Sequence, residues 1–186
     1  RLWLTWRDTG AAALPAWAAY GFWAALGLAV LIKGPIGPMI VGLTALGLGL
    51  VTRRVGWLGA LRPGRGFLLF LAIFAPWYVA ITLKAGGAFW AEALGRDLLG
   101  KVAEAQESHG APPGYFLLTF WVTFWPFGLL VPAGLAWAWI HREEPAVRFC
   151  LAWIIPCWIV FELVPTKLPH YVLPLFPAIA ILSAAA

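Results

Sequence analysis

Two cationic side chains, Lys167 and His170, lie in a proline-rich stretch directly before an apolar run. Prolines block a regular helix and hold the backbone extended or turned, so a constrained backbone places both side chains. The prolines that bracket them are Pro165, Pro169 and Pro174. Charged residues are unfavourable in so apolar a chain, so this pair indicates that positive charge at the rim of the molecule has a function. The alternative interpretation is an interfacial anchor that includes Tyr171.

A second candidate, Lys33, lies in LIKGPIGPM between two apolar runs that are joined by almost no loop. A lysine at the tip of a helical hairpin can keep its alkyl stem in the apolar layer and its ammonium in water. The functional interpretation is that the glycines and prolines after Lys33 fix an exposed backbone, while the ammonium offers a point charge to a phosphate. The residues alone leave both interpretations open.

The segment 84–114 is predicted to be a loop of about thirty residues, and loops of that length are usually functional or disordered. In its first half, FWAEALGRDLLGKV, apolar residues recur every four positions and acid-first ion pairs share that spacing. This pattern predicts a helix that lies flat in the membrane interface, with its apolar face toward lipid or the bundle.

His109 follows this predicted helix in ESHGAPPGYF, where glycines and prolines reverse the chain and hold the histidine at the membrane surface. A lone histidine is more often a hydrogen-bonded surface residue than a ligand. With acidic neighbours, His109 is also a candidate ligand for a divalent metal, although no tight spacing such as HExxH is present. The acidic neighbours are Glu92, Glu104 and Glu107.

The composition, 62% hydrophobic and 11% charged, is that of a membrane protein, because soluble domains carry about 25% charged residues. Lipid leaves no partner for bare peptide groups, so each span must be a helix of about 20 residues. We predict an all-α fold, a polytopic transmembrane helix bundle that forms a single domain over residues 1–186. The chain opens without an initiator Met and reads as a piece of a longer one. The predicted spans are 15–32, 35–51, 67–83, 115–140, 149–164 and 171–186.

The distribution of basic residues predicts the orientation of the bundle. One set of alternating loops contains eight arginines against three acidic residues, whereas the other contains five basic and five acidic residues. Because basic residues concentrate in cytoplasmic loops, the first set is predicted to face the cytoplasm. This assignment places Lys33, the loop 84–114 and residues 165–170 together on the opposite face.

Other functional classes find little support in the sequence. No glycine-rich phosphate loop follows a strand and no GxSxG nucleophile elbow is present. Cys150 and Cys157 are about two helical turns apart, roughly 10 Å, so a disulfide between them is not expected. The net charge of +5 is accounted for by loop topology, so no nucleic acid partner is expected.

Four motifs in order resemble a known family. They are LIKGP, APWYVA, FWAEALGRD followed by SHGAPPGYF, and PTKLPHYVLPLFPAIAIL. Their types and order are similar to those of the bacterial aminoarabinose lipid A transferase-like glycosyltransferases of the protein mannosyltransferase superfamily. The correspondence covers nearly the whole chain, and the last motif is the most specific. The resemblance implies an integral enzyme of the GT-C glycosyltransferase class in the bacterial inner membrane, with its active face periplasmic.

The resemblance also implies roles for individual residues. Those expected to bind the carrier phosphate are Lys33 in KGP, Arg96 in LGRD, and Lys167 with His170 in PTKLPH. His109 and Tyr115 fall in the family's substrate loop. The family's catalytic acidic residue lies in its first periplasmic loop, so the catalytic base is expected upstream of this chain.

The expected reaction transfers a sugar from a polyprenyl phosphate carrier to a lipid or another cell-envelope acceptor. Negative charge grows on the departing phosphate, where positioned cations stabilise the transition state, and an upstream general base would give inversion. No cofactor is required, with a divalent metal at His109 as the possible exception. The carrier tail would lie among membrane lipids in a groove between spans, lined by Trp77, Tyr78, Trp121 and Trp125.

The alternative is a transporter or lipid-binding membrane subunit without enzymatic activity. Glycine and proline inside the spans fit that class, because transporters use broken helices near the membrane midplane. Transporters, however, usually place ionisable groups within the spans, whereas the central stretches of the predicted spans of this chain are neutral. We therefore expect an enzyme.

Overall fold

The computed structural model describes residues 14–91 and 110–186, and no β-strand is assigned within these ranges. The predicted all-α class is confirmed for this part of the chain. The only pairing of β type within it is an isolated antiparallel bridge between Gly110 and Thr166. The chain divides into two compact units, Arg1–Gly86 and Gly87–Ala186.

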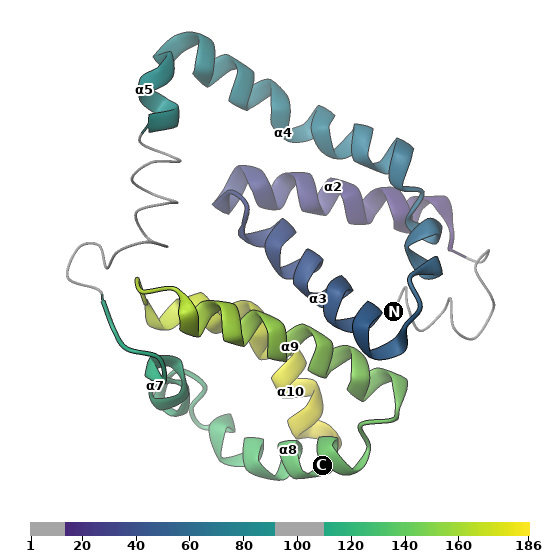
Figure 1. The fold of residues 1–186 in the computed structure, drawn as a ribbon, viewed down its shortest axis with the longest axis vertical. Helices are drawn as coiled ribbons and strands as arrows, with labels where there is room; N and C mark the ends of the chain where they lie inside the picture. The colour runs from purple at the N-terminus through teal and green to yellow at the C-terminus, as the bar shows by residue number, and fades with distance from the viewer. Residues whose placement is uncertain (1–13, 92–109) are drawn as a thin grey trace. The chain divides into compact units, whose positions relative to one another are not determined.

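Over residues 14–86, the described part of the first unit, there are three apolar helices and one short 3₁₀ turn. These are α2 (Ala16–Lys33), α3 (Ile36–Thr52), η1 (Gly56–Leu61) and α4 (Pro63–Ala85). Helix α2 lies beside both α3 and α4, as Figure 1 shows. The turn from α2 to α3 depends on Gly34, whose φ of 62° lies in the left-handed region that glycine adopts without steric cost. The N–H of Gly34 donates to the carbonyl of Val30, which closes the end of α2.

Close backbone contact holds these helices together. A Cβ on Gly27 would lie 3.0 Å from Cβ of Ile73 in α4, and a Cβ on Gly37 would lie 2.7 Å from Cβ of Ala29. In lipid, where hydrocarbon surrounds the helices as well as their side chains, association depends on such close packing rather than on water exclusion. The small residues of α2 and α3 therefore account for the helical hairpin.

In its described residues, 87–91 and 110–186, the second unit contains seven helical elements. They are α5 (Gly87–Trp90), α7 (Tyr115–Thr123), η3 (Phe127–Leu130), α8 (Val131–Ile140), α9 (Pro145–Leu163), η4 (Pro169–Leu175) and α10 (Phe176–Ala185). Helix α10 packs against α8 and α9. Their shared core includes Ala138, Cys150, Ala178 and Leu182. An aromatic group formed by Phe120, Phe124 and Phe176 joins α7 to α10.

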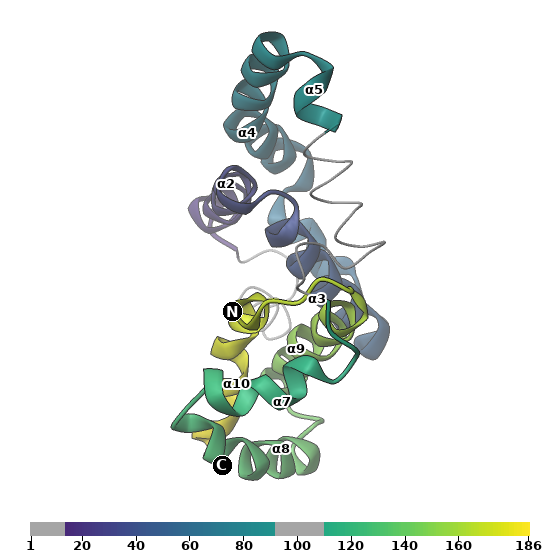
Figure 2. The ribbon, with the colours of Figure 1, turned by 90° about the vertical axis from the view of Figure 1, so that its left-hand side faces the viewer.

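The structure departs from the single span expected over 115–140. Helix α7 ends at Thr123, and the chain bends by 115° before η3 and α8, a change of direction visible in Figures 1 and 2. Pro126 explains the break, because it has no N–H to donate and it disfavours the helical conformation of the residue before it. The predicted segment 171–186 likewise begins as the 3₁₀ turn η4 and becomes α-helical only at Phe176.

Three helices in the described residues are long and apolar enough to cross a membrane, and the bent pair 115–140 would make a fourth. The three are Ala16–Lys33, Pro63–Ala85 and Pro145–Leu163. Helix α3 occupies the predicted range 35–51 but has 17 residues, which is shorter than that length limit. Most of the predicted interfacial helix in 84–114 lies outside the described residues.

A close contact between α8 and α10 gives a prediction. A Cβ on Gly134 of α8 would lie 2.7 Å from Cα of Ser183 in α10, so Gly134→Ala should force the helices apart and lower the thermal unfolding midpoint of the purified protein. We expect a loss of about 1–3 kcal/mol. Gly42→Ala is the matched control, since no atom lies within 4 Å of its added Cβ, and it should leave the midpoint unchanged or raised. Equal midpoints for the two variants would contradict this packing.

Candidate active site

The amino end of helix α7 is capped by a carboxylate from a distant part of the chain. The N-cap residue is Gly114, which has no side chain to accept from the first turn. Glu162 in α9 supplies the acceptors: one carboxylate oxygen accepts from the N–H of Gly114 at 2.8 Å, and the other accepts from Phe116 at 3.1 Å and Leu117 at 3.2 Å. Three N–H groups that the helix itself leaves without partners are thereby satisfied.

The position of Glu162 is electrostatically unusual. It is the second-last residue of α9, where the negative end of the helix dipole disfavours an acidic side chain. Its carboxylate, however, lies at the positive end of α7, and hydrogen bonds to a charged acceptor are about twice as strong as neutral ones. The favourable interaction with α7 therefore accounts for an acid at an otherwise poor position.

The ammonium of Lys167, opposite in charge to Glu162, binds the loop that precedes α7. The residue is 3% exposed, and its Nζ donates to the carbonyl of Ala111 at 2.9 Å and to that of Val164 at 2.7 Å. Burying an ammonium is costly unless its protons find acceptors, and these two carbonyls provide them. An ammonium has three donors, so one N–H is left over from these two bonds.

The backbone completes the link between the two segments. Gly110 and Thr166 form the isolated bridge, and the N–H of Ala111 donates to the carbonyl of Pro165 at 3.3 Å. We call the set of contacts between residues 110–117 and 162–167 the loop clamp. It holds the GAPPGYF and PTK motifs side by side although about fifty residues of sequence separate them, which the motifs alone could not establish.

His170 and Tyr171 begin the turn that follows the loop clamp. His170 is exposed, and its ring lies edge-on to that of Tyr171 with centroids 5.0 Å apart. Pro169 opens η4, and Pro174 lies inside it, so a proline-containing 3₁₀ turn holds this segment, in agreement with the constrained backbone inferred from the sequence. His170 is thus the accessible member of the predicted cationic pair, and Lys167 is the buried one.

The other predicted site residues are distributed as follows. Lys33 is exposed at the last turn of α2, in the first unit, and Tyr115 is half-buried at the start of α7. Arg96 and His109 lie outside the described residues, although Gly110, which follows His109, is held by the loop clamp. Within the described ranges, no group of three or more metal-ligating side chains is present.

The four aromatic residues predicted to line a lipid groove fall in both units. Trp77 and Tyr78 lie on α4, and Trp77 is 51% exposed. In the second unit, Trp121 and Trp125 are both exposed. Trp121 lines an apolar cavity of about 190 Å³ between α7, α8, α9 and α10, together with Leu117, Phe120 and Trp158.

Sequence reasoning assigned no role to Glu162 beyond its share of the loop charge. A signal was present, because Glu162 is the only acidic residue between Pro145 and the end of the chain. An isolated acid near the end of an apolar helix needs a partner, and the N-terminus of another helix is one of the few groups that can serve.

Comparisons with known proteins show which proteins this chain is similar to. No family model matches the chain. The chain is 30% identical to undecaprenyl phosphate-alpha-4-amino-4-deoxy-L-arabinose arabinosyl transferase 1 of Pseudomonas fluorescens, over 90% of this chain and 30% of that protein. The corresponding transferase of Erwinia tasmaniensis is 30% identical over 88% of this chain and 33% of its own length. The chain thus spans about 30% of the length of the curated relatives it matches.

Among solved structures, the chain is similar to ArnT from Cupriavidus metallidurans, crystallised with undecaprenyl phosphate. The TM-score is 0.80 at 24% identity, and the match covers 93% of this chain and 32% of that one. The chain therefore has the helical fold of the matching part of that protein, and three of its described helices are long and apolar enough to cross a membrane. The resemblance drawn from the motifs is confirmed as a sequence similarity: about nine-tenths of this chain matches proteins named as undecaprenyl phosphate-aminoarabinose arabinosyl transferases.

The loop clamp gives a second prediction. Replacing Glu162 by Gln keeps the shape of the side chain but removes the charge that binds three N–H groups and the α7 dipole, so the unfolding free energy should fall by about 1–3 kcal/mol. Thermal unfolding of the purified protein measures the change. Glu144→Gln is the matched control, since Glu144 begins α9 without a side-chain capping bond. A Glu162→Gln variant as stable as Glu144→Gln would contradict the proposed cap.

Proposed function

We propose that this chain forms part of an integral membrane glycosyltransferase that moves a sugar from a polyprenyl phosphate carrier to a lipid or other cell-envelope acceptor. The observation that carries the proposal is the similarity, along 90% of the chain, to proteins named as undecaprenyl phosphate-aminoarabinose arabinosyl transferases. The similar solved structure holds undecaprenyl phosphate, which supports a carrier of the same chemical class.

In the proposed mechanism, cations stabilise the departing phosphate. When the glycosidic bond breaks, its electron pair goes to the phosphate oxygen, and positive groups near that oxygen lower the barrier by interacting more strongly with the transition state than with the donor. Lys33, Arg96 and His170 are the proposed direct partners. Lys167 supplies charge from a buried position and has one N–H beyond its two carbonyl bonds, so its main contribution is to hold the loop clamp.

The acceptor hydroxyl must lose its proton as it attacks the anomeric carbon. A carboxylate outside this chain is the proposed general base, and attack from the face opposite the phosphate gives inversion. The loop clamp positions the GAPPGYF segment, so Tyr115 and His109 are proposed to contact the sugar or the acceptor. No cofactor is needed in this scheme. A divalent cation at His109 is the alternative, and adding EDTA to the same assay distinguishes the two.

The proposal places the reaction on the periplasmic face of the bacterial inner membrane. Support comes from the loop charges, which assign Lys33 and residues 165–170 to the side opposite the arginine-rich loops. The alternative of a non-enzymatic transporter is favoured by one observation, the break between α7 and α8, because transporters use interrupted helices. Sugar transfer by the purified protein would exclude it.

The kinetic prediction concerns the exposed cations. Lys33→Ala and His170→Ala in the intact protein should each lower kcat by about 100- to 1,000-fold, because the lost interaction is made chiefly in the transition state. Transfer of labelled sugar from polyprenyl phosphate donors to candidate lipid and protein acceptors measures the effect. Lys84→Ala removes an exposed lysine from the last turn of α4 and should retain turnover. Normal turnover in both site variants, at equal protein levels, would remove them from the mechanism.

The topological prediction concerns the face of the membrane. A cysteine placed at the exposed position 170 should react with a membrane-impermeant maleimide in cells whose outer membrane is permeabilised, whereas a cysteine at position 54 should react only after the inner membrane is opened. Both variants carry Cys150→Ala and Cys157→Ala, which remove the buried native thiols. The reverse labelling pattern would place the candidate site on the cytoplasmic side and overturn the proposed function.

A further inference from the structure

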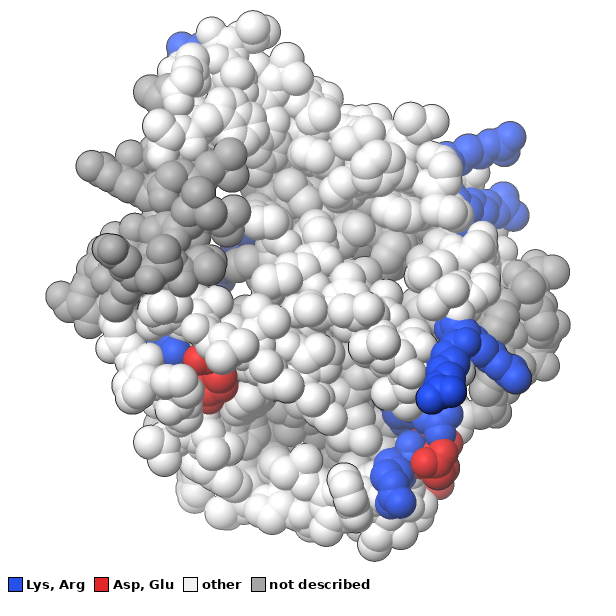
Figure 3. Space-filling model, viewed as in Figure 1, with Lys and Arg blue, Asp and Glu red and all other residues white. Residues whose placement is uncertain are grey.

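The turn between α3 and α4 carries a concentration of positive charge that the proposed reaction does not use. Four arginines, Arg53, Arg54, Arg62 and Arg65, surround η1, and all four are exposed. No acidic residue occurs anywhere in residues 14–86. Figure 3 shows basic side chains projecting from the edge where α3, η1 and α4 meet, and we call this surface the arginine turn. Its charge has no acidic counterpart in the described part of the first unit.

The backbone of the arginine turn is held by the indoles of two tryptophans, of which Trp57 is buried and Trp23 is half-buried. The indole N–H of Trp57 donates to the carbonyl of Arg54 at 3.2 Å, and that of Trp23 in α2 donates to the carbonyl of Leu61 at 2.8 Å. Trp57 and Leu61 are buried, and Gly66 allows the ring of Trp23 to approach because any Cβ there would overlap it. Since both ends of η1 are tied to indoles, the arginines stand on a fixed support rather than on a loose loop.

Two of the arginines occupy backbone conformations that disfavour any side chain. Arg53 has a φ of 52° and Arg62 a φ of 51°, and they are the only non-glycine residues with positive φ in the described residues. Glycine adopts this region at no steric cost and is the common residue just past a helix end. Strained conformations of this kind cluster at functional sites. An arginine at each position therefore places a guanidinium there at the expense of local stability.

The surroundings of the arginine turn are apolar. Val51, Val55 and Phe67 are largely exposed on either side of it, so a ligand that meets the guanidinium groups also meets hydrocarbon-compatible surface. A small soluble anion would use only the charges. An amphiphile whose anionic head binds arginine and whose chains contact the apolar flanks would use both.

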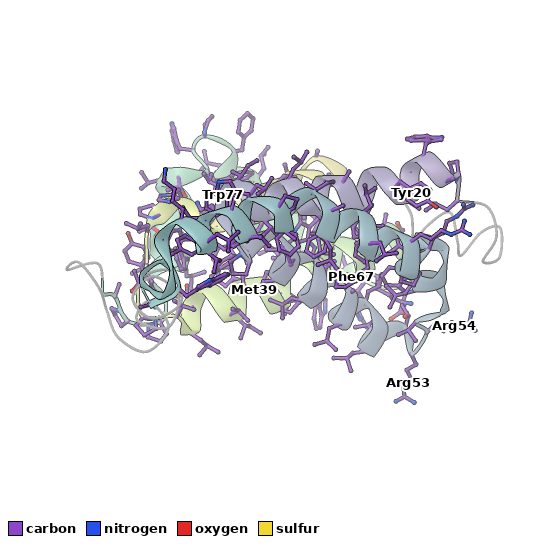
Figure 4. The ribbon with its side chains drawn as sticks, turned by 90° about the horizontal axis from the view of Figure 1, so that it is seen from above. Tyr20, Met39, Arg53, Arg54, Phe67 and Trp77 are labelled. Carbon is purple, nitrogen blue, oxygen red and sulfur yellow. The ribbon has the colours of Figure 1, made fainter. Side chains whose placement is uncertain are left out.

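From these observations we propose that the arginine turn is a binding site for the headgroups of anionic phospholipids at the membrane surface. Figure 4 shows Arg53 and Arg54 directed away from the helices, where a lipid phosphate can reach them. The site anchors the α3–α4 connection against the membrane. It is independent of the proposed sugar transfer, since it uses different residues.

The test measures lipid preference in the intact purified protein. After removal of native lipid, native mass spectrometry with phosphatidylglycerol and with phosphatidylcholine gives an apparent Kd for each. Wild-type protein should bind phosphatidylglycerol at least tenfold more tightly, and each arginine removed should cost about fivefold of that preference. Arg53→Gly is the informative variant, because it should weaken phosphatidylglycerol binding while leaving the thermal midpoint equal to or above that of wild type.

Two controls test whether the arginine turn is a specific lipid site. One tests the effect of losing any positive charge, and the other tests binding of the phosphate group alone. Lys84→Gln removes the same charge from the far end of α4 and should keep the full preference. Glycerol phosphate at millimolar concentration should not displace the lipid. The proposal is overturned if wild type shows no preference for phosphatidylglycerol, if Arg53→Gly and Lys84→Gln lose equal amounts of it, or if glycerol phosphate competes as well as the lipid.

Discussion

Two charged side chains five residues apart, Glu162 and Lys167, bind backbone groups of a loop that lies 45 to 56 positions away. The carboxylate of Glu162 accepts from N–H groups of the loop, and the ammonium of Lys167 donates to a carbonyl of the loop. Each charged group therefore binds the peptide group of opposite partial charge. In an apolar chain such groups have few alternative partners, because lipid offers none. The start of α7 and the position of the proline-rich segment both depend on this pair of contacts.

This dependence changes the meaning of the PTKLPH motif. A lysine and a histidine between prolines suggest two equivalent cations, but the structure gives them different surroundings: Lys167 is 3% exposed and hydrogen-bonded to Ala111 and Val164, whereas His170 is exposed beside Tyr171. The buried ammonium of Lys167 makes the local electrostatic potential more positive, and it also fixes the conformation of the loop that it binds. An exposed imidazole can contact a ligand. The motif therefore combines a supporting residue with one available for binding.

The sequence predicted the helical class and most helix positions because hydropathy reports directly on the need to satisfy peptide groups in lipid. It failed at 115–140, where Pro126 interrupts an apolar run that continues on both sides. Hydropathy cannot detect a break in a helix when the segments on both sides of the break are equally apolar. The partners of Glu162 and the burial of Lys167 were also beyond reach, since they depend on which backbone groups a distant segment leaves without hydrogen bonds.

The residues of this chain with a proposed role include several whose type is unfavourable for their local structure. Glu162 lies at the wrong end of its own helix, Lys167 is a buried cation, and Arg53 and Arg62 hold backbone conformations suited to glycine. For the first two, the compensating contacts are visible, and they build the candidate active site. For the arginines, the structure shows the strain, and within the described residues no contact to their guanidinium groups compensates for it, which agrees with the proposed lipid site. Consistency between local preference and fold is the general expectation, and departures from it mark the residues selected for another purpose.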